Sequence, residues 1–180
     1  MPAPIKVELT PHDLRWSGAA LDEGERVKSA LGDNLVIVHH VGSTAIPGIR
    51  AKPVIDLMPV VESLDRLDAA RDRIEALGYA WWGEYGLPGR RYCHLDDQRT
   101  GWRLVQLHCY QQGNTEIIRH IAFRDYLRSR PEIAARYEAE KIRCGALHPN
   151  DSHAYSDCKS DWIRRVEAMA MTELGRKRGS

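Results

Sequence analysis

The spacing of hydrophobic residues changes along the chain, from mixed strand and helix patterns in the first two thirds to helical periodicity in the last third. Apolar runs rich in β-branched residues predict two buried strands, at 35–41 and 53–61. Three shorter strands are expected at 79–85, 91–95 and 102–110. Apolar residues recurring at intervals of three and four predict helices at 11–31, 63–78, 115–130, 131–144 and 152–174.

This order of elements predicts an α+β fold, with a mixed or antiparallel sheet flanked by helices and a helical C-terminal third. The first helix is expected to begin at Pro11, because Thr10 can cap it and proline suits the first helical position. No domain linker or repeat interrupts residues 1–174, so we expect a single domain there. The remaining residues, 175–180 (GRKRGS), are expected to form a disordered basic tail.

Composition and charge narrow the function. The chain has 180 residues, 43% hydrophobic and 28% charged, as in an ordinary globular domain. Its net charge of +1 means that affinity for phosphate must come from a local basic cluster, and a nucleic-acid partner is not expected. Because no signal peptide is visible and no apolar stretch reaches the roughly 18 residues of a membrane helix, we expect a cytoplasmic protein without a membrane partner. The oligomeric state stays open.

The four cysteines, at 93, 109, 144 and 158, show no C-x-x-C spacing, so neither a zinc ribbon nor a thioredoxin-like motif is indicated. Free thiols are therefore expected. The alternative is a zinc site across the sheet, because Cys93-His94 and His108-Cys109 lie on two predicted strands.

The most visible chemistry lies between the first two strands. At Gly42 no Cβ blocks the chain, so backbone N–H groups and the hydroxyls of Ser43 and Thr44 could approach phosphate oxygens. Lys52 could neutralise phosphate charge, while Asp56, within a buried strand, could bind a divalent cation such as Mg²⁺. The alternative is a tight turn beside an aspartate paired with Lys52 or an arginine, because a buried carboxylate needs a partner.

Gly42-Ser43, with Asp56 on the next strand, resembles the signature of the nucleotidyltransferase superfamily. The fuller string HHVGSTAIPGIRAKPVIDLMPVV is similar to the GrpB family within it, as are GEYGLPGRRY, LHCY, IAFRDYLRSRPEIAARYEAEK and AYSDCKSDWI in the same order. The resemblance covers Val7 to Ile163. It implies a sheet with helices packed on it and a cleft in which Gly42 and Ser43 face a nucleotide. Related modules fused to dephospho-coenzyme A kinase suggest a nucleotide or coenzyme A context.

The chain departs from the superfamily pattern at the expected metal site. Catalytic members carry two carboxylates two residues apart on this strand, but the second position here is Met58, and a thioether is a poor ligand for Mg²⁺. A third carboxylate is also absent from the later strand, where Gln106 and His108 share a face with Tyr110. We expect Met58 to pack in the core, because its strand is apolar on both faces.

Further candidates follow on the later strands. Glu84, in a glycine-flanked loop, could bring a carboxylate over the cleft or could be solvated. Arg90 and Arg91 are both candidates, but adjacent strand residues face opposite ways, and we favour Arg91 for the ligand. His108 could be a general base or a nitrogen ligand beside Asp56, or a hydrogen-bonded structural histidine.

Three helical residues complete the candidate set. Arg124, in the family-like FRDYLR segment, could reach a phosphate or pair with a carboxylate. Tyr155 and Lys159 lie four residues apart and could close the cleft, although charged helix faces are often only solvated.

Two functions remain open at this stage. One is a nucleotidyltransferase that binds its nucleotide at Gly42 and Ser43, holds Mg²⁺ at Asp56, and activates an acceptor with His108 or Glu84. The other is a non-catalytic module for a nucleotide or other phosphate-bearing ligand, which has lost the second metal carboxylate. Both predict an anion pocket bounded by the Gly42 turn, Lys52 and one arginine of the 90–91 pair.

Overall fold

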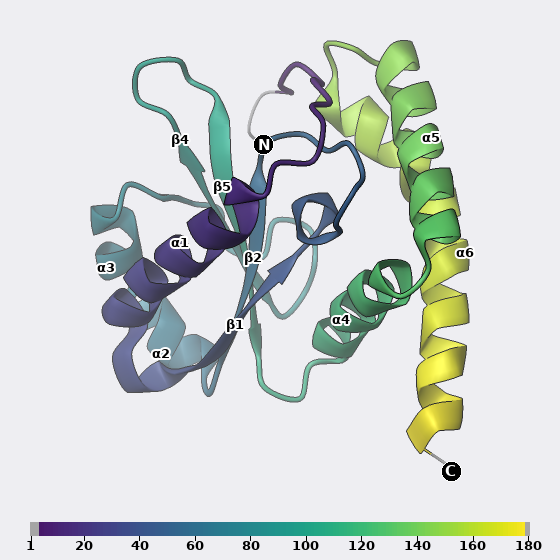
Figure 1. Ribbon diagram of the computed structural model, residues 1–180. Coiled ribbons are helices and arrows are strands. Elements are labelled where there is room, and N and C mark those ends of the chain that lie inside the picture. Colours follow the sequence, from purple (N-terminus) through teal and green to yellow (C-terminus); the bar gives the residue numbers. More distant parts are fainter. Residues whose placement is uncertain (1–3, 179–180) are drawn as a thin grey trace.

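The computed structural model describes residues 4–178, which form one five-stranded sheet with helices on both sides. The strand order is β1 (Leu35–Val41), β2 (Ile55–Val61), β5 (Arg103–Gln111), β4 (Arg90–Asp96) and β3 (Ala80–Trp81). Strands β2 and β5 are parallel, and the other neighbouring strands are antiparallel. This mixed sheet with a helical C-terminal third confirms the predicted fold class (Figure 1).

Helices α1 (Arg15–Leu31), α2 (Leu64–Ala69) and α3 (Arg71–Ala76) cover one face of the sheet (Figure 1). Alternate strand residues reach this face and pack with the helices into the largest apolar core, as expected from the period of two in a strand. Leu57 of β2 and Leu107 of β5 are among the most deeply buried side chains there. These two side chains are withdrawn from solvent.

Helices α4 (Thr115–Arg128), α5 (Pro131–Leu147) and α6 (Ser152–Arg178) lie on the other side of the sheet (Figure 1). Phe123, Tyr137 and Val166 from these helices pack with Ile46 and Ile49, from the loop between β1 and β2, in a second core. The loop that ends β1 is therefore anchored to the helical third of the chain. None of the helices that the structure describes is both long and apolar enough to cross a membrane. The cytoplasmic location stays a prediction.

Two of the four cysteines are not the free thiols that the sequence predicted. Cys144 of α5 and Cys158 of α6 form a disulfide, so the expectation of free thiols is wrong for these two residues. The short turn between the helices brings the start of α6 back against α5, which spacing in the sequence does not reveal. Cys93 and Cys109 are free and buried.

The zinc alternative is also wrong. Cys93 and Cys109 both belong to the core beneath α1, α2 and α3. The histidines next to them, His94 and His108, point to the opposite face because strand residues alternate, and His108 lines a cavity there.

Several predicted boundaries shift. Helix α1 begins at Arg15 because Thr10 exchanges backbone hydrogen bonds with Ala51 instead of capping a helix at Pro11. The helix expected at 63–78 is divided into α2 and α3. The strand expected at 79–85 is reduced to β3, because the chain turns through positive φ at Gly83 and Tyr85.

The predicted disordered tail is wrong up to Arg178, where α6 ends. A glycine inside a helix costs only about 1 kcal/mol relative to alanine, so Gly175 does not end the helix. Lys177 also forms an ion pair of 2.8 Å with Glu173, one helical turn earlier. Residues 179 and 180 lie outside the described part of the chain.

Candidate functional site

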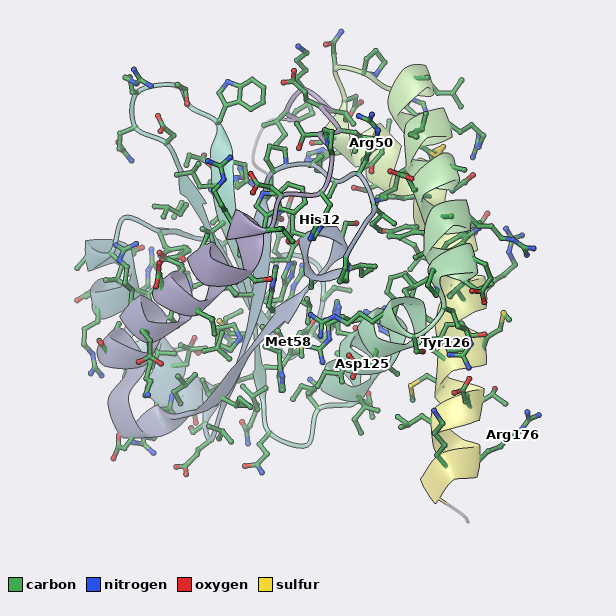
Figure 2. The ribbon with its side chains drawn as sticks, in the orientation of Figure 1. His12, Arg50, Met58, Asp125, Tyr126 and Arg176 are labelled. Carbon is green, nitrogen blue, oxygen red and sulfur yellow. A yellow bond between two sulfur atoms is a disulfide. The ribbon has the colours of Figure 1, made fainter. Side chains whose placement is uncertain are left out.

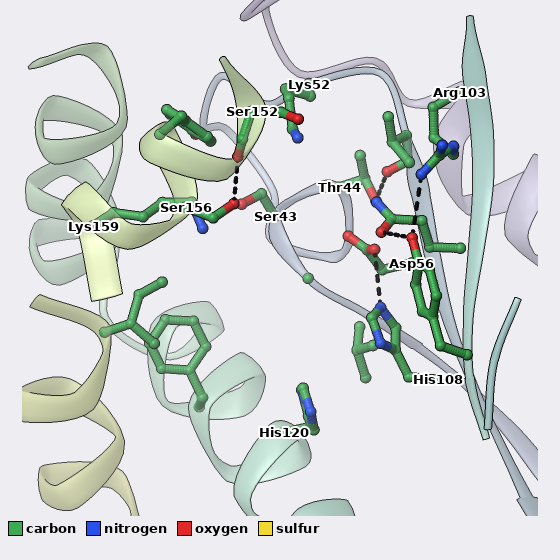
Figure 3. Close-up of a pocket in the computed structure, with 18 of the residues that line it drawn as sticks. Ser43, Thr44, Lys52, Asp56, Arg103, His108, His120, Ser152, Ser156 and Lys159 are labelled. Carbon is green, nitrogen blue, oxygen red and sulfur yellow. Dashed lines mark hydrogen bonds and ion pairs between the residues drawn. The ribbon is translucent and has the colours of Figure 1, made fainter. Parts of the chain in front are cut away.

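A cavity of about 680 Å³ lies on the face of the sheet opposite to α1, α2 and α3. Its walls come from the loop between β1 and β2, residues of strands β2, β4 and β5, and side chains of α4, α5 and α6. It brings together most of the residues that the sequence singled out: Gly42, Ser43, Thr44, Lys52, Asp56, Arg90, His108, Tyr155 and Lys159. Figure 3 shows Ser43, Lys52, Asp56, His108 and Lys159 around the cavity.

Gly42 has to be glycine for two reasons. Its φ of 70° lies in the left-handed region, and a Cβ at this position would lie 2.3 Å from Oδ2 of Asp56. The predicted close approach therefore exists, and it is an approach to the aspartate. Any larger residue would displace the carboxylate or the turn.

The two hydroxyl residues of the turn behave differently. Ser43 Oγ donates to the hydroxyl of Tyr137 over 3.3 Å and faces the cavity (Figure 3). Thr44 is buried, and its Oγ1 hydrogen-bonds with His40 Nε2 at 2.9 Å and donates to the carbonyl of Val54 at 3.4 Å. Burial lowers the pKa of His40 to about 4, so this histidine is neutral near pH 7. The Thr44 hydroxyl holds the turn in place, and Ser43 is the better candidate to meet a ligand.

Asp56 and His108 lie on the neighbouring strands β2 and β5 with their side chains on one face, as predicted. His108 Nε2 is 3.4 Å from Asp56 Oδ1 (Figure 3). The two side chains remain 17% and 24% exposed, so a molecule in the cavity can reach both. Their proximity supplies a carboxylate and an imidazole for proton transfer or ligand binding.

Lys52 and Lys159 reach the cavity from two different elements, the loop before β2 and the helix α6. Their ammonium nitrogens lie 5.5 and 5.2 Å from the centroid of the same ring, Tyr155. Among the described residues neither lysine has an ion-pair partner within 4.0 Å. Burial lowers the pKa of Lys52, and burial together with the charge of Lys52 lowers that of Lys159 to about 8.

Three predicted site residues lie elsewhere. Arg91 points to the other side of the sheet and binds Asp68 of α2 through two hydrogen bonds of 2.6 and 2.7 Å. Arg90 is the arginine that lines the cavity, so the preference for Arg91 is wrong. The register decides this, because Arg90 is paired with Tyr110 of β5 and therefore shares a face with His108.

Glu84 turns away from the cavity. Its carboxylate accepts a hydrogen bond of 2.7 Å from the backbone N–H of Gly89 and lies 3.7 Å from Arg91, so it closes its own loop. Arg124 is also outside the cavity, because its guanidinium donates to the carbonyl of His40 and to Asp125. The structure therefore does not bring Glu84 and Arg124 together with the other predicted site residues.

The cavity contains basic residues that the sequence did not single out as site residues. Arg103 donates a hydrogen bond of 2.5 Å to the carboxylate of Asp96. Arg119 forms ion pairs with Glu116 and Glu167. His120 is kept neutral, because burial and the nearby His108 lower its pKa to about 3. Ser152, Ser156 and Lys159 of α6 also line the cavity. Their spacing of four and three residues could have indicated that they lie on one face of a helix.

The residues around Asp56 do not fit a two-metal site. Met58, two residues along β2, is fully buried among Val41, Tyr110, Ile117 and Ile121 (Figure 2). Gln106, across from Asp56 on β5, is occupied by a hydrogen bond of 2.6 Å from the hydroxyl of Tyr92. One carboxylate with a nearby imidazole falls short of the hard oxygen set that Mg²⁺ prefers.

Comparison with known proteins identifies the family. The sequence matches the GrpB protein family over residues 6–169. This chain belongs to the GrpB family. It is 38% identical over 165 residues to UPF0157 protein YqkA of Bacillus subtilis, a match that covers 92% of the chain and 47% of YqkA. The chain thus spans about half the length of that relative. It is also 30% identical to a dephospho-CoA kinase of Mycolicibacterium paratuberculosis, over 88% of the chain and 44% of the kinase.

Solved structures agree with this assignment. The crystal structure of GrpB from Enterococcus faecalis has a TM-score of 0.87 and 35% identity, covering 93% of this chain and 99% of that chain. The Cid1 poly(U) polymerase has a TM-score of 0.51 and 13% identity, over 80% of this chain and 43% of that chain. The second likeness is one of fold alone, and it shows that the GrpB chain has a nucleotidyltransferase-like fold.

Proposed function

We propose that this GrpB protein binds a nucleotide or another phosphate-bearing ligand in the cavity, as a binding module that has lost two-metal chemistry. The observation that supports the proposal is the pair of ammonium groups of Lys52 and Lys159, which face the cavity and have no carboxylate within 4.0 Å among residues 4–178. Two neighbouring half-buried cations repel each other and lose part of their hydration. A phosphate group between them would offset both costs.

The remaining cavity groups suit the same ligand. Ser43 offers a hydroxyl from the Gly42 turn on the wall shared with Lys52. Arg103 and Arg119 are already paired with carboxylates, so they contribute to the field of the cavity without a free bidentate contact. Binding of the anion would thus depend mainly on the two lysines.

The packing of Met58 favours the binding module over the nucleotidyltransferase. Because its thioether is enclosed by apolar side chains, the second metal position is filled by core. A half-buried carboxylate needs a hydrogen-bond partner, and His108 is the partner of Asp56. Asp56 can therefore be retained without a metal.

A catalytic version of the function would depend on Asp56 and His108. Both are open to the cavity, and an aspartate could bind one divalent cation while the imidazole accepts a proton from an acceptor group. Release of pyrophosphate from nucleoside triphosphates with Mg²⁺ or Mn²⁺, abolished in Asp56→Asn, would favour this version.

Calorimetric titration tests the binding proposal. Sulfate, nucleoside triphosphates and dephospho-coenzyme A form the panel, the last because of the similarity to a dephospho-CoA kinase. We expect Lys52→Met and Lys159→Met each to weaken anion binding by about tenfold, which is about 1.4 kcal/mol. Lys28→Met is the matched control, because Lys28 is an exposed lysine of α1 beyond the other face of the sheet. Equal loss in all three variants, or no loss in any, would reject the lysine pair as the anion site.

A further inference from the structure

The cavity has an aromatic end as well as a cationic one. Tyr85, from the loop before β4, stacks on Tyr92 of β4 with ring centroids 4.9 Å apart and planes inclined by 19°. Both rings line the cavity. The guanidinium of Arg90 lies 5.7 Å from the centroid of the first ring and 5.3 Å from that of the second. Tyr92 is buried behind, and Tyr85 keeps partial exposure.

The backbone at Tyr85 is strained. Its φ of 47° makes it the one residue other than glycine with positive φ among residues 4–178. Such a conformation costs of order 1 kcal/mol or more and persists where surrounding contacts enforce it. Here Arg90 enforces it, because its Nη2 donates to the carbonyl of Tyr85 over 2.7 Å and its Nε to that of Glu84 over 3.3 Å. The loop is thereby fastened to β4 with the tyrosine ring held at the cavity.

The aromatic and cationic ends are arranged in order across the sheet. The ring of Tyr92 on β4 lies 5.5 Å from that of His108 on β5, and His108 contacts Asp56 on β2. Lys52, from the loop before β2, and Lys159, on α6, lie on the side of Asp56 away from His108 (Figure 3). A ligand that spans the cavity would therefore meet a flat aromatic surface at one end and two ammonium groups at the other.

We propose that Tyr85, backed by Tyr92, forms a stacking subsite for an aromatic heterocycle such as a nucleobase. This inference rests on the proposed function and sharpens it, because it requires a ligand with a ring at one end and phosphate at the other. Aromatic side chains bind nucleobases by stacking, with little dependence on which base is present. The subsite thus separates nucleotides from small phosphates and predicts similar affinity for purine and pyrimidine nucleotides.

Calorimetry with two probes tests the subsite. Adenosine and uridine triphosphates carry a ring, and inorganic tripolyphosphate carries only the anion. We expect the wild type to bind the nucleoside triphosphates about tenfold more tightly than tripolyphosphate, within the range measured for one stacked base. Tyr85→Leu should remove this difference and leave tripolyphosphate affinity unchanged. Tyr85→Phe should keep it, because the ring remains.

Trp102→Leu is the control, since Trp102 is an exposed aromatic residue in the turn between β4 and β5 and does not line the cavity. Tripolyphosphate binding without any preference for nucleotides would overturn the subsite and leave the proposed anion site standing. Equal weakening of both probes in Tyr85→Leu would also overturn it, because the tyrosine would then only support the loop. If neither probe bound the wild type, the proposed function would fail, and the subsite with it.

Discussion

The two faces of the sheet are built from the same strands and differ in almost every physical property. On the face beneath α1, α2 and α3, residues such as Leu57 and Leu107 form an apolar core. On the other face, the residues next to them, Asp56 and His108, line a cavity that holds basic and aromatic groups. The period of two along a strand lets one segment stabilise the fold and present chemistry at the same time.

The second face is itself divided. Farther along β2 and β5, Met58 and Tyr110 pack under α4 with Ile117 and Ile121, while Asp56, two residues before Met58, is open to the cavity. The boundary between core and site thus runs between two residues of the same strand. Mutations on either side of these boundaries should separate stability from ligand binding.

The largest effect is expected from Met58→Asp, which places a carboxylate at a fully buried position of the core. A buried carboxylate without a partner should lower the free energy of unfolding by several kcal/mol, on the order of 3 to 5. Nucleotide-dependent Mg²⁺ affinity should not improve. A denaturant melt and a calorimetric Mg²⁺ titration on both proteins measure the two effects. A stable variant that binds the metal clearly more tightly would show that Met58 occupies a recoverable metal position.

A smaller contrast is expected between the neighbours Leu107 and His108. Leu107→Ala should cost about 3 kcal/mol of stability, because it leaves a cavity in the apolar core, with anion affinity unchanged where the protein is folded. His108→Gln should alter stability by under about 1 kcal/mol and anion binding by about 1 kcal/mol, the contribution of one hydrogen bond. Chemical denaturation and titration of the same samples compare them. If Leu107→Ala lowered anion affinity more than His108→Gln, or His108→Gln lowered stability more than Leu107→Ala, the proposed separation of stability and binding between the two faces would be wrong.

The smallest effect concerns pH, and it should have opposite signs for binding and for stability. The folded pKa of Lys159 is lowered to about 8, below the ordinary 10.5. Sulfate, whose charge is constant in this range, should therefore bind more weakly as pH rises through 8, because the ammonium is lost. Between pH 8 and 10.5 the unfolded chain binds more protons at this lysine than the folded one, so this group makes stability rise with pH.

Titrations with sulfate at pH 7 and pH 9 measure the first effect, and denaturant melts at pH 8 and pH 10 the second. Both changes should shrink in Lys159→Met and persist in Lys28→Met. A pH dependence identical in the two variants would assign it to another group.

Local patterns in the sequence determined the elements and much of the cavity wall. Apolar runs gave the strands at 35–41 and 53–61, and the alternation along β5 placed His108 with Gln106 and Tyr110 on one face, as the structure has them. The turn at Gly42 and the burial of Met58 also followed from residues close in the chain. These features depend on the period of a strand or the conformational range of one residue, which short segments carry themselves.

The tertiary structure decided which residues from distant segments contact one another. Whether Arg90 or Arg91 enters the cavity depends on the register between β4 and β5, and the loop geometry removed Glu84 from the site. The disulfide between α5 and α6, and the meeting of Lys52 with Lys159 over Tyr155, depend on the packing of the C-terminal helices against the sheet. Such contacts follow from the packing of whole elements and are not encoded in any local spacing, because residues far apart along the chain meet only when the loops between them close.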